Sequence, residues 1–151
     1  MESTQDKNVK VFIDCIRHYF ETVAPGTELT IEPPFLKGPD DRVILSYTGI
    51  IGISGDHKGA IFVSCPPSLL DDLLIRIGEP EPSVELRLDI TGELANTISG
   101  NLRREFGPNF LISVPVVIRD VSEVKFPKSA KNLVLPLHWN GHKGFVVISL
   151  E

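Results

Sequence analysis

A long amphipathic segment, residues 83–106, constrains the fold of this chain more than any other feature. A stiff Glu79-Pro80-Glu81-Pro82 linker precedes the segment, and Gly107-Pro108 ends it. Ser83 is a typical helix cap, and Glu85 in the first turn suits the helix dipole. The spacing of the apolar residues predicts one long helix with a continuous buried stripe. That stripe consists of Ile90, Leu94, Ala95, Ile98, Leu102 and Phe106.

The opposite side of this helix carries a distinctive polar set. At about 100° per residue, the exposed side holds Asp89, Glu93, Asn96, Gly100 and Arg103, with Gly92 at its border. Glu93 and Asn96 stand three residues apart, so a carboxylate and a carboxamide point the same way. Glycine costs about 1 kcal/mol relative to alanine inside a helix, and asparagine is a poor helix former. An ordinary solvated face and a docking surface both fit this pattern, and the spacing alone leaves both open.

The rest of the chain reads as a second long helix, a short helix and several strands. Apolar periodicity predicts a helix over residues 6–23, ended by Pro25-Gly26, and a short helix over residues 66–77, closed by Gly78. Strand candidates are residues 27–36, 42–54, 59–65, 110–119, 132–139 and 144–150. The order is helix-strand-strand-strand, a short helix, then helix-strand-strand-strand. It predicts a single α+β domain over residues 1–151, with a largely antiparallel sheet and a pseudo-twofold repeat.

Composition and spacing exclude several classes of function. The formal net charge is −5 and lysine and arginine form no run, which argues against a nucleic-acid partner. No apolar stretch is long enough for a membrane span or a signal peptide, so we expect a cytoplasmic protein. Cys15 and Cys65 lack ligand spacing and are expected to be buried free thiols. The four histidines are scattered, so no metal site is predicted.

Residues 89–101 resemble the signature helix of the CheX branch of the CheC/CheX/FliY phosphatases, which act on phosphorylated CheY in bacterial chemotaxis. Residues 50–59 are similar to that family's glycine-bounded hairpin, and residues 113–118 to its strand after the signature helix. The closing hairpin, residues 133–150, fits as well. The resemblance therefore covers most of the chain.

The resemblance implies a mechanism. Asn96 would position the attacking water, and Glu93 would engage the active-site lysine of a phosphorylated CheY-like receiver domain. Asp89, Gly92, Gly100 and Arg103 would form the surrounding docking surface. The required Mg²⁺ would sit on the receiver, so this chain would bind no cofactor of its own.

The resemblance also implies one active site per chain and a homodimer formed by joining sheets. The first helix offers only Asp14-Cys15-Ile16-Arg17 at the comparable exposed spacing, without a Glu-x-x-Asn pair. Two alternatives stay open at this stage. The chain could be a non-catalytic module of the same fold that only binds a receiver or a motor component. It could also be a structural domain whose motif match is accidental.

Overall fold

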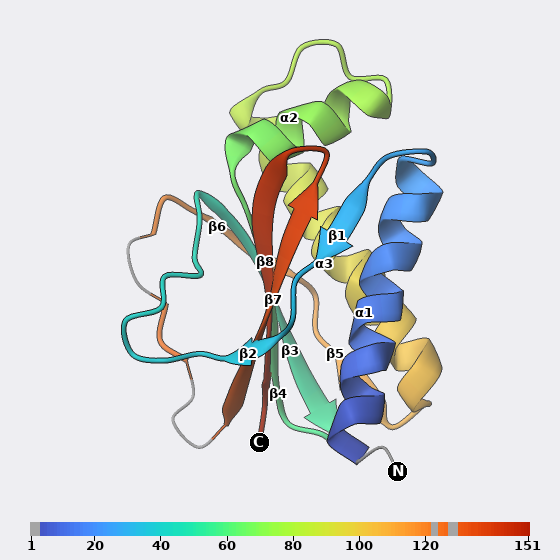
Figure 1. The fold of residues 1–151 in the computed structure, drawn as a ribbon, viewed down its shortest axis with the longest axis vertical. Coiled ribbons are helices and arrows are strands. Elements are labelled where there is room, and N and C mark those ends of the chain that lie inside the picture. Colours follow the sequence, from blue (N-terminus) through green and yellow to red (C-terminus); the bar gives the residue numbers. More distant parts are fainter. Residues whose placement is uncertain (1–3, 122–123, 127–129) are drawn as a thin grey trace.

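An antiparallel sheet forms the middle of the molecule, with two long helices on one face and loops on the other (Figure 1). The computed structural model describes residues 4–121, 124–126 and 130–151. The helices are α1 (Thr4–Val23), α2 (Pro67–Arg76) and α3 (Val84–Phe106). The strands are β1 (Leu29–Ile31), β2 (Phe35–Leu36), β3 (Tyr47–Gly55), β4 (Gly59–Cys65), β5 (Phe110–Ile112), β6 (Val116–Arg119), β7 (Lys131–Trp139) and β8 (His142–Leu150). The predicted α+β class, with its two long helices and one short helix, is confirmed.

The order of strands in the sheet carries the predicted pseudo-twofold repeat. It runs β1-β7-β8-β4-β3-β5, with β2 also pairing with β7 and β6 also pairing with β3. Two hairpins, β3–β4 and β7–β8, therefore form the centre, and β4 pairs with β8 where they meet. The outer strands of each half pair with the hairpin of the other half. Strands β1 and β2 pair with β7, whereas β5 and β6 pair with β3. The two halves are interlocked by this exchange.

Each outer strand is broken into two short pieces. Pro33-Pro34 separates β1 from β2, and the segment ending in Pro115 separates β5 from β6, because proline cannot donate to a ladder. The segment between β5 and β6 remains attached to β3, because the Gly52 backbone N–H donates to Ser113 Oγ at 2.8 Å. The sequence predicts an edge or a bend over residues 27–36, and the structure shows both.

The strand predicted from Arg42 was wrong at its start, because β3 begins only at Tyr47. Val43 and Leu45 are instead part of a small apolar cluster with side chains of the sheet. The backbone N–H of Leu45 donates to Ser64 Oγ at 2.6 Å, which fixes this loop to β4. Of the polar segment predicted as a loop, residues 120–131, positions 122, 123 and 127–129 lie outside the described residues.

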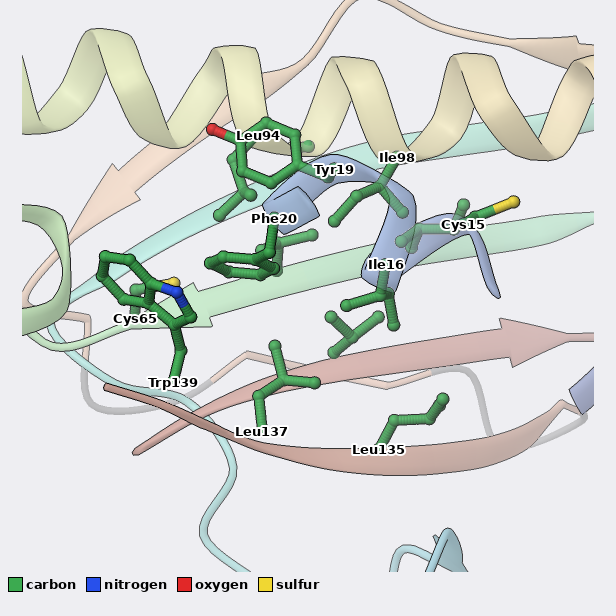
Figure 2. Close-up of a cluster of buried hydrophobic side chains, with 14 of the residues drawn as sticks. Cys15, Ile16, Tyr19, Phe20, Cys65, Leu94, Ile98, Leu135, Leu137 and Trp139 are labelled. Atoms are coloured by element: carbon green, nitrogen blue, oxygen red, sulfur yellow. The ribbon is translucent and has the colours of Figure 1, made fainter. Parts of the chain in front are cut away.

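Successive residues of the central strands point into two separate cores, as alternation along a strand requires. The larger core lies between the sheet and the helices α1 and α3; Figure 2 shows α1 side chains between α3 and β7. The smaller core lies on the opposite face and is formed by Val43, Phe62, Val134, Phe145 and Val147. No helix in the described part of the chain is long and apolar enough to span a bilayer.

Candidate functional site

Helix α3, which carries Glu93 and Asn96 (the acid–amide pair), lies very close to the sheet. A Cβ atom at Gly49 of β3 would stand 2.9 Å from Ala95 Cβ and 3.1 Å from the Thr91 carbonyl oxygen, so only glycine permits this approach. At the start of α3, Ser83 Oγ accepts a hydrogen bond from the Leu86 N–H at 3.2 Å and caps the helix as predicted. The close approach of Thr91 and Ala95 to Gly49 therefore sets the position of α3 on β3.

The two faces of α3 are those that the sequence predicts. Ile90, Leu94, Ala95, Ile98 and Leu102 are buried, and Phe106 packs partly buried against the same core. On the opposite side, four of the predicted polar residues are exposed, and the two glycines are partly buried. The exposed residues are Asp89, Glu93, Asn96 and Arg103. Burial of the apolar stripe thus turns the acid–amide pair outward.

Glu93 and Asn96 line one groove between α1 and α3. The groove has a volume of about 500 Å³ and includes residues from α1, from α3 and from the end of α2. Its other lining residues are His18, Tyr19, Thr22, Val23, Ile77, Ile90, Thr97, Asn101 and Arg104. The structure therefore brings the two predicted catalytic residues to the same concave surface.

The four predicted docking residues lie outside that groove. Gly100 and Arg103 line a separate shallow hollow near the end of α3, together with Gly107. Gly92 faces the sheet, since a Cβ there would stand 3.4 Å from Val117 Cγ2. Asp89 lies one turn before Glu93 and is exposed.

The two glycines of the helix differ in their surroundings. A Cβ at Gly100 would meet no heavy atom within 4 Å, whereas a Cβ at Gly92 would touch β6. A side chain at Gly92 would therefore meet a neighbouring strand of the same chain. Gly100 has no such neighbour, so its lack of a side chain leaves open space on the outer surface.

Glu93 and Asn96 are not engaged by the rest of the molecule. Within the described residues, no hydrogen bond or ion pair holds either side chain. Tyr19 lines the groove with them, and its pKa is raised first by burial, then by Cys65 and by the negative charge of Glu93. The acid–amide pair is therefore available to an outside group.

Sequence reasoning did not identify the residues that α1 contributes to the groove, which are His18, Tyr19, Thr22 and Val23. They belong to a different helix, and nothing local in the sequence links them to residues of α3. It also missed Gly49. An isolated glycine inside an apolar strand is a known sign of close backbone approach, so a signal for Gly49 was present.

The two cysteines are unsuited to nucleophilic chemistry. Both are buried free thiols, as predicted. Burial raises the pKa of Cys15 to about 11, with Glu105 and Asp14 adding to the effect, and burial raises the pKa of Cys65 to about 12. Among the described residues, no group of three or more histidine, cysteine or acidic side chains could hold a metal ion. The groove instead offers a carboxylate and an amide, which can orient a water molecule and a cation.

The family model for the chemotaxis phosphatase CheX matches residues 47–138, which is more than half of the chain and includes the whole of α3. The chain belongs to the CheX family. The sequence resemblance to this family is thereby confirmed.

Solved structures of chemotaxis proteins share the fold. The chemotaxis protein CheX from Vibrio vulnificus superposes with a TM-score of 0.84 at 22% identity, covering 96% of this chain and 99% of that one. A chemotaxis protein from Desulfovibrio vulgaris Hildenborough gives a TM-score of 0.82 at 24% identity, covering 96% and 97%. The CheX–CheY–BeF3–Mg complex from Borrelia burgdorferi gives 0.73 at 16% identity, covering 95% and 97%. No curated protein sequence matches this CheX-family chain.

Proposed function

We propose that this CheX-family protein is a phosphatase that hydrolyses the phosphoaspartate of a CheY-like receiver domain, in chemotaxis or a related two-component pathway. One observation carries the proposal: Glu93 and Asn96 line the same groove with side chains that the described residues leave unengaged. Two facts support it. The family is described as chemotaxis phosphatases, and a CheX of this fold has been solved in complex with CheY.

In this proposal the chain supplies position, and the receiver supplies the phosphoryl group. The Asn96 carboxamide accepts and donates hydrogen bonds, so it can orient a water molecule for in-line attack. A carboxylate in its place would face an anionic phosphoryl group. Glu93 is the anchor, because its negative charge suits the lysine of a receiver active site. Mg²⁺ on the receiver neutralises the phosphoryl oxygens, so the chain needs no cofactor of its own.

The docking surface that we propose surrounds this pair along α3. Asp89 extends the acidic side by one turn, and Arg103 offers a cation that no described carboxylate pairs with. Gly100 leaves open space beside them. Gly92 lies at the border of this surface, where a Cβ would make an ordinary 3.4 Å contact with Val117 Cγ2.

The test is a phosphate-release assay on phosphorylated receiver domains from the same organism. We expect the wild-type protein to accelerate loss of phosphate from at least one of them. Asn96→Ala and Glu93→Ala should abolish the acceleration, and Thr97→Ala, an exposed neighbour in the same groove, should retain it. Full activity of the folded Asn96 and Glu93 variants would show that the site is assigned wrongly. Receiver binding without faster phosphate loss would select the non-catalytic alternative.

We further propose that two copies associate through the β5–β6 edge, which would extend the sheet across the dimer. Leu111, Val114 and Val116 are exposed there by 45%, 82% and 60%, at the outer side of the sheet. An apolar sheet edge of this kind is a site for strand pairing. Light scattering should show a dimer for the wild-type protein and a monomer for Val116→Lys. A monomeric wild-type protein would contradict this proposal.

A further inference from the structure

The short helix α2 breaks the symmetry of the fold beside the candidate site. It lies between the two halves and has no counterpart within the described residues 4–121, 124–126 and 130–151, and Figure 1 shows it beyond the ends of the central strands. Its C-terminal cap, Ile77, lines the same groove as Glu93 and Asn96. Ile77 is nevertheless 45% exposed. An apolar side chain therefore stands half-solvated at the rim of the groove.

The structure holds α2 firmly in this place. Leu69, Leu70, Leu73 and Leu74 are all buried in the main core. Arg87 of α3 forms a two-pronged ion pair with Asp71, with Nε 2.6 Å from Oδ1 and Nη2 3.0 Å from Oδ2. This pair joins α2 directly to the helix that carries the acid–amide pair.

A second attachment joins α2 to the turn between β7 and β8. Asn140 Nδ2 donates to Asp72 Oδ2 at 2.7 Å, and His142 Nε2 lies 3.0 Å from the same oxygen. At the end of the helix, the Ile77 N–H donates to the carbonyls of Leu73 and Leu74 at 3.2 Å. Because α2 is attached on both sides, the backbone of Ile77 is fixed before any partner arrives, which reduces the entropic cost of binding.

We propose that Ile77 is a docking contact for the receiver domain, packing against an apolar side chain that borders the partner's phosphorylated aspartate. This inference rests on the proposed function. A receiver seated over Glu93 and Asn96 must cover the rim of the groove, and covering Ile77 removes its exposed apolar surface from water. Such a contact forms equally in the ground state and the transition state, so it contributes to KM and not to kcat.

The experiment compares two isoleucines at the same end of α2. Ile75 is 56% exposed and lies outside the groove, so Ile75→Asp is the matched control for Ile77→Asp. Binding is measured with receiver loaded with beryllofluoride and Mg²⁺, and dephosphorylation with phosphorylated receiver. We expect Ile77→Ala to weaken binding and raise KM about fivefold to tenfold, and Ile77→Asp to do so by more than about tenfold. In both, kcat should stay within about twofold, and Ile75→Asp should match the wild type.

The outcomes separate this inference from the proposed function. Loss of binding in Ile77→Asp with normal binding in Ile75→Asp supports the contact, even for a wild-type protein that binds receiver without hydrolysing it. Equal binding by the wild type and both variants overturns it while leaving phosphatase activity intact. Absence of any receiver binding by the wild type overturns both. Because Ile77 is half-exposed, its variants should fold, and thermal unfolding checks this.

Discussion

The helices α1 and α3 occupy matching places in the two interlocked halves, yet they meet the sheet in different ways. α3 lies on β3 at Gly49, where Ala95 comes too close for any side chain to intervene. α1 instead rests on large side chains: Phe20 packs against Trp139 with ring centroids 5.4 Å apart, and Leu135 and Leu137 lie on the same strand (Figure 2). Close contact fixes the height of α3 above the sheet, and the acid–amide pair is on that helix.

The outer faces of the two helices differ as well. α3 presents Glu93 and Asn96, whereas the exposed residues of α1 include Asp14 and His18 and no amide at the comparable spacing. The short helix α2 is also joined to α3, through the ion pair between Asp71 and Arg87. The symmetry of the fold therefore supplies the scaffold, and the candidate function lies in the features that break the symmetry.

The largest effect on this contrast is expected from Gly49→Ala. The new Cβ would stand 2.9 Å from Ala95 Cβ, so α3 must move away from β3. Overpacking of this kind costs about 2 kcal/mol of unfolding free energy, which lowers Tm by roughly 4–8 °C for a chain of this size. Thermal and urea denaturation measure it.

Gly52→Ala on the same strand is the matched control. Its Cβ would make an ordinary contact with Ser113 Oγ at 3.5 Å, so we expect a much smaller loss of stability. Equal losses in the two variants would mean that close contact at Gly49 does not set the position of α3.

A smaller effect, of opposite sign, is expected from Gly100→Ala. A Cβ at this position meets no heavy atom within 4 Å, so alanine should raise the unfolding free energy by about 0.5–1 kcal/mol through helix propensity. The same methyl group would occupy space that we assign to the receiver, so the rate of dephosphorylation should fall. A variant that is more stable and fully active would remove Gly100 from the docking surface.

The smallest effect concerns the attachment of α2 to Asn140 and His142 through Asp72, whose contribution to stability depends on pH. Burial alone would raise the pKa of Asp72, but hydrogen bonds from Asn140, His142 and Arg76 outweigh it and hold the pKa below the ordinary value of 3.8. A carboxyl group whose pKa is lower in the folded state than in the unfolded state stabilises the protein at pH values above its unfolded-state pKa. That stabilisation is lost as pH falls through the folded value.

Asp72→Ala should therefore be less stable than the wild type at about pH 5, and the difference should shrink as pH falls below 3.8. Urea denaturation over this range measures the difference. A difference in unfolding free energy that stays constant down to about pH 2.5 would show that the charge of Asp72 does not stabilise this attachment of α2.

The sequence predicted the parts of this molecule that depend on local pattern. The caps at Ser83 and Gly107 and the two faces of α3 all follow from neighbours in the chain. The exchange of edge strands between the halves could not be predicted, because the pairing of β1 with β7 joins residues more than a hundred positions apart. Local periodicity contains no information about such pairing.

The candidate site was likewise predictable only where it depends on local pattern. Glu93 and Asn96 were found because both lie on one helix, and their spacing alone puts them on one face. The groove around them needs α1 and the end of α2, which only the tertiary fold brings to α3. Residues such as Tyr19 and Ile77 therefore had no signal in the sequence that tied them to the site.

The central claim is that α3, and not its counterpart α1, carries the phosphatase site. The most direct test is the rate of phosphate release from a phosphorylated receiver with the wild-type protein, Asn96→Ala and Asp14→Ala, both positions being exposed. Losing a group that orients the attacking water should slow the Asn96→Ala variant by about 100-fold or more, and Asp14→Ala should stay within about twofold of the wild type. A folded Asn96→Ala variant with the wild-type rate would contradict the account.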